Sequence, residues 1–403
     1  MSADRKDFPF LNNHPTLAYF DNAATTLKPQ IVIDRVVDYY ENLSANVGRG
    51  DHTLAHTTTM NYEAVRTQCA QFLNAPSSSV VFTSGASHSL NLVAVSFGSV
   101  ILKEGDVVLL NEAEHASNIL PWFEIAEKTK AKIEFIPLEQ DGRLSLESLK
   151  KAMHPRVKIV SVNHASNVLG YLNDIKAMTE IVHEHGAYIN VDGAQSVGHM
   201  AIDLKDLDVD FFSFSAHKML GPTGVGILYG KEELLDQMSV YFSGGGSNVR
   251  FNSCGDIVYK KAPAKFEVGT PNIEGVLGFG AALDYLNEVG METIHAITEP
   301  IRKYVSTELS KMDHVEVFNA DAEMGIVSFT VHGIFAQDVA AYLSSKDIAV
   351  RAGEHCAKLL NGVLHQEKSV RASFYFYNTL EEAKRLVDAV ASITLEQTID
   401  LYL

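Results

Sequence analysis

The stretch from Ser213 to Gly224, S-F-S-A-H-K-M-L-G-P-T-G, places Lys218 on a short connection between two apolar runs. Small residues flank the lysine, Ser215 and His217 precede it, and a glycine–proline turn follows. A lysine that loses hydration in such surroundings shifts toward the neutral amine, the form that attacks an aldehyde. The alternative is a surface lysine that follows a buried strand. Lys218 is a candidate for covalent chemistry if other groups support it.

Three further groups of polar residues follow apolar, strand-like runs. The run T-S-G-A-S, which contains Ala86 and Ser87, precedes a helical pattern and suits a phosphate, although an ordinary helix N-cap has the same composition. His115 also follows a strand-like run, where a histidine is often structural. Asp192 precedes a glycine and is either a partner for a cation or a turn aspartate.

These four groups together match the chemical needs of pyridoxal 5'-phosphate. The cofactor requires a phosphate cradle, a stacking imidazole, a carboxylate for its pyridinium nitrogen and a lysine for its aldehyde. Ligands collect at the carboxyl ends of strands in parallel sheets, so residues that follow successive strands are expected to converge. The sequence therefore predicts one pyridoxal-phosphate site around Lys218.

Seven strand-like runs alternate with helical patterns and predict an α/β fold with a mostly parallel, seven-stranded sheet. One intervening segment, from Asn173 to His185, has apolar residues at helical spacing and is followed by the capping residue Gly186. The runs are Val80–Thr83, Val107–Leu110, Lys132–Ile136, Val157–Val162, Ala187–Val191, Val209–Phe214 and Val225–Tyr229.

The pattern changes after Gly230, where a glycine-rich region from Gly244 predicts a loop or hairpin. Helices are expected near 280–287 and 298–312. Strands near 315–318, 326–331 and 348–351, with helices near 337–345 and 380–393, indicate a smaller C-terminal α+β domain. The predicted bounds are 15–290 for the large domain and 291–403 for the small one, with residues 1–14 packing near the latter.

Composition limits the class of protein. With 403 residues, 46% of them hydrophobic and 21% charged, the chain is expected to be a soluble globular protein. A net charge of -17 argues against binding to nucleic acid or an anionic membrane. The three cysteines, Cys69, Cys254 and Cys356, suggest neither a disulfide framework nor a metal cluster. The start of the chain has no signal-peptide core, and we expect a cytoplasmic protein.

The chain resembles the class V, fold type I pyridoxal-phosphate enzymes, and most closely the Suf-type, or group II, cysteine desulfurases and selenocysteine lyases. The last two of the matching motifs favour a desulfurase, because an aminotransferase of this class does not need the cysteine. The motifs are Y-F-D-N-A-A-T-T from Tyr19, H-T-L from His52, E-H-A-S-N-I-L-P-W from Glu114, N-H-A-S-N-V-L-G from Asn163, D-G-A-Q-S from Asp192, S-A-H-K from Ser215, F-E-V-G-T-P-N from Phe266, R-A-G-E-H-C-A from Arg351 and R-A-S-F-Y-F-Y-N-T from Arg371.

The resemblance implies a role for each matching residue. Lys218 would bond to the cofactor aldehyde and move the substrate α-proton, Asp192 would pair with the pyridinium, and His115 would stack on the ring and act as a catalytic residue. Arg371 would clamp the substrate carboxylate in a bidentate fork. The remaining implied residues are Gln195 for the phenolic oxygen, Ala86, Ser87, Ser215 and His217 around the phosphate, Thr270 from the second subunit of a homodimer, and Asn167 and Arg351 beside the substrate and cofactor.

Cys356 would take the sulfur of L-cysteine as a persulfide and release alanine, if the resemblance extends to the reaction. Its thiolate would be the nucleophile, helped by His355 or by cofactor charge. The alternative is a small buried cysteine. The short segment from Cys356 to Arg371 implies a partly recessed cysteine that relies on a sulfur-acceptor protein in iron–sulfur or other cofactor assembly. A selenocysteine lyase, another class V aminotransferase-type enzyme and a catalytically silent scaffold stay as alternatives.

Four positions depart from the family pattern. Gly48, in V-G-R-G, and Glu354 each stand where a histidine is frequent. Ala116 also replaces a histidine, and His88 replaces a frequent acid. These departures leave open the rate, the preference between cysteine and selenocysteine, and the identity of the sulfur acceptor.

Overall fold

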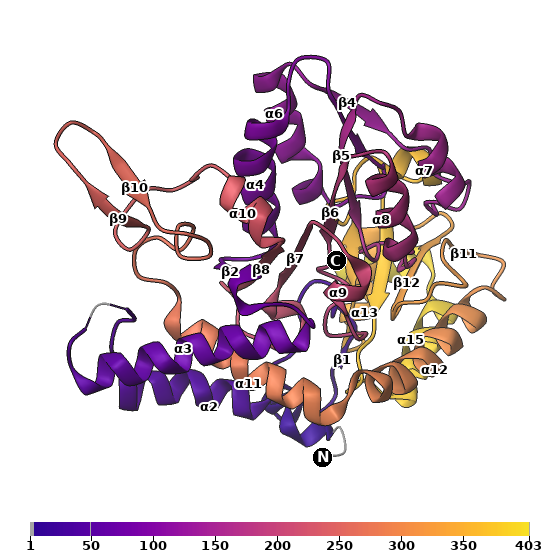
Figure 1. Ribbon diagram of the computed structural model, residues 1–403. Helices are drawn as coiled ribbons and strands as arrows, with labels where there is room; N and C mark the ends of the chain where they lie inside the picture. The colour runs from indigo at the N-terminus through magenta and orange to yellow at the C-terminus, as the bar shows by residue number, and fades with distance from the viewer. Residues whose placement is uncertain (1–3, 49, 403) are drawn as a thin grey trace.

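The computed structural model describes residues 4–48 and 50–402, so Arg49 of the V-G-R-G run lies outside the described residues. A seven-stranded sheet with the order β2-β8-β7-β6-β5-β3-β4 forms its centre, which confirms the predicted fold class (Figure 1). Strands β3 to β7 pair in parallel, whereas β8 is antiparallel to both of its neighbours. The strands are β2 Val80–Thr83, β3 Val107–Leu110, β4 Lys132–Phe135, β5 Val157–Asn163, β6 Tyr188–Asp192, β7 Phe211–Ser215 and β8 Gly226–Gly230.

Helices connect these strands, and α8 (Ile175–Glu184) shows why its sequence is helical. The side chain of Asp174 caps the amide of Ala177, and Met178 and Val182 are buried on one face. Gly186 follows with a φ of +68°, a left-handed conformation that glycine adopts without strain. The helix therefore confirms the prediction for this segment. The other short helices here are α4 Ala86–Leu92, α5 Ser99–Ile101, α6 Leu120–Thr129, α7 Leu146–Ala152, α9 Leu204–Leu207 and α10 Glu232–Gln237.

Three helices, α2 (Gln30–Asp38), α3 (Thr53–Phe72) and α11 (Ile273–Val289), lie together at the lower left of Figure 1, with α11 packed against the other two. Helix α11 begins at Ile273, not near residue 280 as the sequence predicted. The sequence did not predict the first turns of α11 because they contain glycines, which have a low helix propensity. A Cβ on Gly278 would come within 2.8 Å of Val36, so the glycine permits the close approach of α2.

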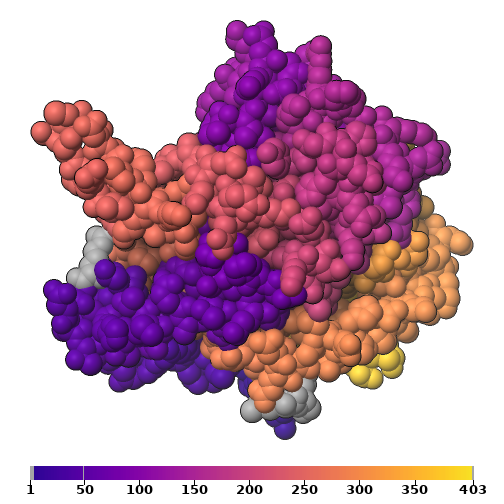
Figure 2. Space-filling model, in the orientation of Figure 1, coloured from indigo at the N-terminus to yellow at the C-terminus, as the bar shows by residue number. Residues whose placement is uncertain are grey.

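A hairpin of β9 (Asn248–Phe251) and β10 (Ile257–Tyr259) occupies the glycine-rich region after Gly244, as predicted. It stands away from the body of the chain (Figures 1 and 2). Its apolar side chains are exposed, with Val249 at 65% and Phe251 at 73% of full accessibility. A hairpin with exposed apolar side chains is a candidate contact surface.

The C-terminal part contains a four-stranded sheet in the order β11-β12-β15-β14. Strand β15 was not predicted, because S-V-R-A-S reads as polar although all five residues are buried. Residues from the start of the chain pack here: β1 pairs with β13, and Ser373 donates from its amide to the carbonyl of Phe20 at 2.7 Å. The bounds are β1 Ala18–Tyr19, β11 Val315–Val317, β12 Ile326–Val331, β13 Ile348–Ala349, β14 Arg351–Gly353, β15 Ser369–Ser373, α12 Met291–Leu309, α13 Ala336–Ser344, α14 Leu360–Leu364, α15 Leu380–Ser392 and α16 Leu395–Ile399.

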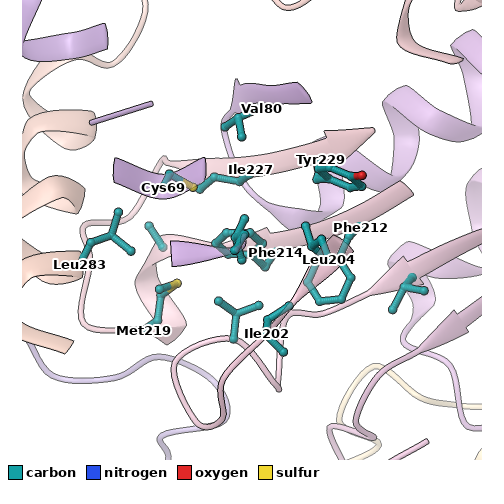
Figure 3. Close-up of a cluster of buried hydrophobic side chains, with 14 of the residues drawn as sticks. Cys69, Val80, Ile202, Leu204, Phe212, Phe214, Met219, Ile227, Tyr229 and Leu283 are labelled. Atoms are coloured by element: carbon teal, nitrogen blue, oxygen red, sulfur yellow. The ribbon is translucent and has the colours of Figure 1, made fainter. Parts of the chain in front are cut away.

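Two hydrophobic clusters accompany the two main sheets. The larger cluster includes Met219, Phe214 and Leu283 beneath the end of β7 (Figure 3). A second cluster joins Ala18 and Phe20 to residues of β12 and β15. The domain bounds 15–290 and 291–403 stay a prediction. Among the described residues, no helix combines the length and apolar character needed to cross a membrane.

Candidate active site

A cavity of about 250 Å³ opens where the carboxyl ends of β2, β3, β5, β6 and β7 face strand β15. Every predicted site residue except Thr270 lines it. The predicted residues on its wall are Ala86, Ser87, His115, Asn167, Asp192, Gln195, Ser215, His217, Lys218, Arg351, Cys356 and Arg371. His355, expected from the sequence to help the Cys356 thiolate, lines it too. Residues that the sequence did not single out also line it: Ala23, Ala24, Leu90, Ser117, Asn163, Ala165 and Ala194.

Lys218 ends a single 3-10 turn, Ala216–Lys218, that directly follows β7. The next two residues, Met219 and Leu220, are fully buried and anchor the turn in the core, where Figure 3 shows Met219. Burial lowers the pKa of Lys218 to about 8, and the negative charge of Asp192 only partly opposes this effect. The site therefore holds a lysine whose neutral form is accessible near neutral pH.

Asp192 is the last residue of β6 and is buried between β5 and β7, opposite Asn163 and Ser213. One carboxylate oxygen accepts from the amide of Ala194 at 2.9 Å. Gln195 follows on the same loop and donates to the carbonyl of Ala23 at 2.9 Å, which ties the N-terminal segment to the cavity. A carboxylate at this edge of a parallel sheet has the position of a ligand-binding residue.

His115 follows β3, and its Nδ1 accepts from the amide of Ser117 at 3.1 Å. Burial is the main reason that its pKa lies below the ordinary histidine value. The neighbouring Glu114 is fully buried and accepts hydrogen bonds from Asn111, Asn118 and Asn163. Because this carboxylate joins the ends of β3 and β5, it fixes the loop that carries His115.

Ser87 lies in the first turn of α4, just after β2, and Ser215 is the last residue of β7. The hydroxyl of Ser215 accepts from the amide of Ala86 at 2.7 Å, and that of Ser87 bonds to Ser117 at 2.7 Å. Gly226 passes so close that a Cβ there would lie 2.4 Å from the nitrogen of Gly85. The Ala86 amide therefore already has an acceptor in Ser215. The donors that remain for a phosphate here are mainly the serine hydroxyls.

Arg371 lies on β15 and is 2% exposed. Its Nη1 donates to the carbonyl of Asn167 at 2.7 Å, and its Nη2 lies 3.3 Å from Asp21. Within the described residues its buried Nε has no partner, so a donor is left for an incoming acceptor. Burial lowers its pKa to about 10. Arg351 pairs with Arg371 across β14 and β15 but is exposed.

Cys356 lies at the wall of the cavity and is exposed in this chain, so the prediction of a partly recessed cysteine was wrong. Its backbone and that of His355 adopt φ values of +59° and +51°, which turn the chain sharply. The carbonyls of these two residues accept from Ala116 and Asn167 at 2.8 and 2.7 Å. The backbone is therefore pinned although the thiol is accessible.

Several other residues lie away from this cavity. Thr270 is exposed, and its hydroxyl accepts from Asn46 at 3.2 Å. His88 lines a neighbouring cavity and bonds to Ser84. Cys69 is buried and Cys254 is exposed on the hairpin. Throughout the described part of the chain, no cluster of three or more histidine, cysteine and acidic side chains could hold a metal ion.

The class-V aminotransferase family matches residues 18–386 of this chain. A probable cysteine desulfurase of Halalkalibacterium halodurans is 42% identical over 403 residues, covering 99% of this chain and 98% of the relative. A cysteine desulfurase of Haloferax volcanii is 40% identical, covering 97% and 96%. Among solved structures, the apo cysteine desulfurase of Thermococcus onnurineus has a TM-score of 0.92 at 37% identity, covering 97% of this chain and 98% of that one.

Another similar structure is the cysteine desulfurase CsdA of Escherichia coli, with a TM-score of 0.90, 34% identity and 98% coverage of both chains. The fold is that of the fold type I pyridoxal-phosphate enzymes. The chain belongs to the class-V aminotransferase family. The side chains of the cavity fit pyridoxal 5'-phosphate, because they combine an amine of lowered pKa with a buried carboxylate, an imidazole and serine hydroxyls.

Proposed function

We propose that this protein is a pyridoxal-phosphate-dependent cysteine desulfurase that converts L-cysteine to L-alanine and takes up the sulfur on Cys356. The observation that carries the proposal is that Lys218, Asp192, Arg371 and Cys356 all line one cavity. The first two suit the cofactor, whereas an arginine and a thiol suit an amino acid that contains sulfur. The family and the named relatives support the same activity.

The residues that would hold the cofactor lie on consecutive strand ends. Lys218 would hold its aldehyde, Asp192 its ring nitrogen and His115 its ring face, with Gln195 at the phenolic oxygen. Ser87, Ser215 and His217 would surround the phosphate, next to Ala86, and Asn167 would contact the cofactor from the side of Arg371. The bound cofactor supplies a sink for the electrons released at the substrate Cα. Lys218, with its pKa lowered to about 8, is suited to move the α-proton.

Arg371 would bind the substrate carboxylate through its free Nε and a neighbouring Nη. Its existing bonds to Asn167 and Asp21 hold the guanidinium in place. The planar fork matches a carboxylate in a way that lysine does not. Asn167 and Arg351 lie beside it and would orient the amino acid.

The thiolate of Cys356 would attack the substrate sulfur. An S–S bond forms as the substrate Cβ–S bond breaks, and the carbon takes up a proton to give alanine. One cysteine and one enzyme thiol thus yield one alanine and one enzyme persulfide. An accessible thiol on a pinned backbone suits this transfer, because the sulfur can be reached without movement of the main chain.

The test compares Cys356→Ser with Cys254→Ser, which alters another exposed cysteine outside the cavity. Alanine and protein-bound sulfur are measured after the addition of L-cysteine. We expect Cys356→Ser to retain the visible cofactor band but form no persulfide, and Cys254→Ser to behave as the wild type. Equal alanine formation by both variants would refute the role of Cys356. A keto acid as the product would favour an aminotransferase, and activity on selenocysteine alone would favour a lyase.

The active unit in this proposal is a homodimer in which Thr270 completes the phosphate site of the second subunit. Exposed apolar residues on and beside α2, among them Ile31, Val37 and Tyr40, support a contact surface there. In this scheme, a homodimer with Lys218→Ala in both subunits is inactive, and a homodimer with Thr270→Ala in both subunits is impaired. When they are mixed and reassembled, one site per heterodimer has both residues, and activity should rise. If isolated heterodimers were no more active than the two homodimers, Thr270 would not contribute to the site of the second subunit.

We also propose the Suf-type assignment, a sulfur-acceptor protein and a role in iron–sulfur or other cofactor assembly in the cytoplasm. The R-A-G-E-H-C-A motif and the short segment between Cys356 and Arg371 support the Suf type. The free thiols support a reducing compartment. Transfer of ³⁵S from labelled Cys356 to a copurifying protein, lost in Cys356→Ser, is the test for the acceptor.

A further inference from the structure

The backbone carbonyl of His217, the residue before Lys218, accepts four hydrogen bonds from one short segment. Thr26 donates from its amide at 3.0 Å and its hydroxyl at 3.1 Å. Thr25 donates from its hydroxyl, and Lys28 from its ammonium, each at 3.1 Å. A carbonyl oxygen has two lone pairs, so the four donors share them and together fix the position of this carbonyl.

The ammonium of Lys28 is used entirely in this cluster. It donates to the carbonyl of His217, to the hydroxyl of Thr25 at 3.3 Å and, over a shorter distance, to the carbonyl of Thr26. Burial lowers the pKa of Lys28 to about 8. No carboxylate within the described residues forms an ion pair with it. A partly buried cation without an acidic partner lowers the stability of the folded state. The three hydrogen bonds of Lys28 are what compensate for this loss.

The segment that contains Thr25, Thr26 and Lys28 also binds the residues that follow Lys218. The hydroxyl of Thr26 accepts from the amide of Leu220 at 2.8 Å while it donates to His217. Core packing of Met219 and Leu220 holds the turn from below (Figure 3). Lys218 is therefore fixed at the residue before it and at the second residue after it, and only its side chain is free to reach into the cavity.

We propose that Lys28 is a positioning residue for Lys218. Together with Thr25 and Thr26 it sets the direction in which Lys218 leaves the backbone. The inference rests on the proposed function in that it takes Lys218 as the lysine that holds the cofactor. Lys28 does not line the cavity and contacts neither substrate nor cofactor in this scheme.

The test compares Lys28→Met with Lys265→Met. Lys265 is a matched control because it is 5% exposed, donates to the carbonyls of Asp236 and Met238 at 3.0 Å, and lies outside the cavity. Cofactor-free protein is titrated with pyridoxal phosphate and followed by its visible band. The Kd is expected to rise at least about tenfold for Lys28→Met and less than about twofold for Lys265→Met. The pH midpoint of the visible band should shift only in Lys28→Met.

Thr26→Val and Thr26→Ser provide a second arm if Lys28→Met does not fold. Thr26→Val removes the hydroxyl hydrogen bonds to His217 and Leu220, whereas Thr26→Ser keeps them. A rise in the Kd for pyridoxal phosphate in Thr26→Val but not in Thr26→Ser supports the inference. An unchanged Kd and band midpoint in Lys28→Met, or equal effects in valine and serine, would overturn it. Failure of the wild type itself to bind the cofactor would instead overturn the proposed function.

Discussion

Arg371 donates a 2.7 Å hydrogen bond from Nη1 to the backbone carbonyl of Asn167, and the Asn167 amide donates at 2.7 Å to the carbonyl of His355. One asparagine thus connects the arginine proposed for the substrate carboxylate with the residue that precedes the nucleophile. The three residues come from three separate segments of the chain. The spacing between carboxylate site and thiol is therefore set by a hydrogen-bonded chain.

Asn167→Ala removes the donor that holds the carbonyl of His355. We expect the first turnover of L-cysteine to slow by about tenfold, since the loss of one buried hydrogen bond costs about 1–3 kcal/mol. Quenched-flow measurement of alanine checks this. Asn252→Ala, which removes a hydrogen bond to Asp256 on the hairpin, is the control and should react as the wild type. An unchanged first turnover in Asn167→Ala would contradict the connection.

Lys218→Met should stabilise the cofactor-free protein at pH 7. The folded state holds the Lys218 pKa at about 8, below its ordinary 10.5, so the charged lysine disfavours folding at neutral pH. The gain should be about 1–3 kcal/mol below pH 8 and should vanish as the pH rises to about 10.5. Urea unfolding across this range measures it. Lys128→Met, at a side chain that is 67% exposed, should give no such gain.

His164 should contribute to unfolding in acid. It is buried, its Nδ1 has no partner among the described residues, and burial lowers its pKa to about 4. Between pH 6.5 and about 4 the unfolded chain binds a proton that the native state does not, so stability falls as the pH falls. His164→Leu should remove up to about 3 kcal/mol of this fall. His154→Gln, at an exposed ring, is the control, and an equal pH slope in wild type and His164→Leu would contradict the prediction.

Arg66 and Glu267 form a buried bidentate pair at 2.6 and 2.8 Å, and Glu267 also accepts from the amide of Phe82. Arg66→Met should lower the free energy of unfolding by about 3–5 kcal/mol, because it leaves the largely buried carboxylate of Glu267 without its ion-pair partner. Glu267→Gln should cost less, since Arg66 keeps its ion pair with Glu63 at 2.8 Å. The double variant should lose much less than the sum, as measured in a double-mutant cycle. At the exposed Lys151–Glu147 pair, Lys151→Met should leave the free energy of unfolding almost unchanged. Additive losses at Arg66 and Glu267 would contradict coupling.

Local sequence patterns predicted the central sheet because its buried strands read as continuous apolar runs between helical segments. The strand ends likewise indicated Lys218, Asp192 and His115. Strand β15 escaped prediction because its polar residues are paired only through tertiary contacts, as Ser373 is with Phe20. Ser117 also required the fold, since its partner Ser87 lies 30 residues from it in the chain. No local pattern reports the accessibility of Cys356.

The pairing of Ser373 with Phe20 has a consequence for synthesis. These residues are 353 apart in the chain, and the strand that contains Ser373 also carries Arg371. Contacts between such distant segments form late, after the intervening chain exists. The wall of the cavity can therefore close only after Arg371 and Ser373 have been synthesised, so a shorter nascent chain has no complete site.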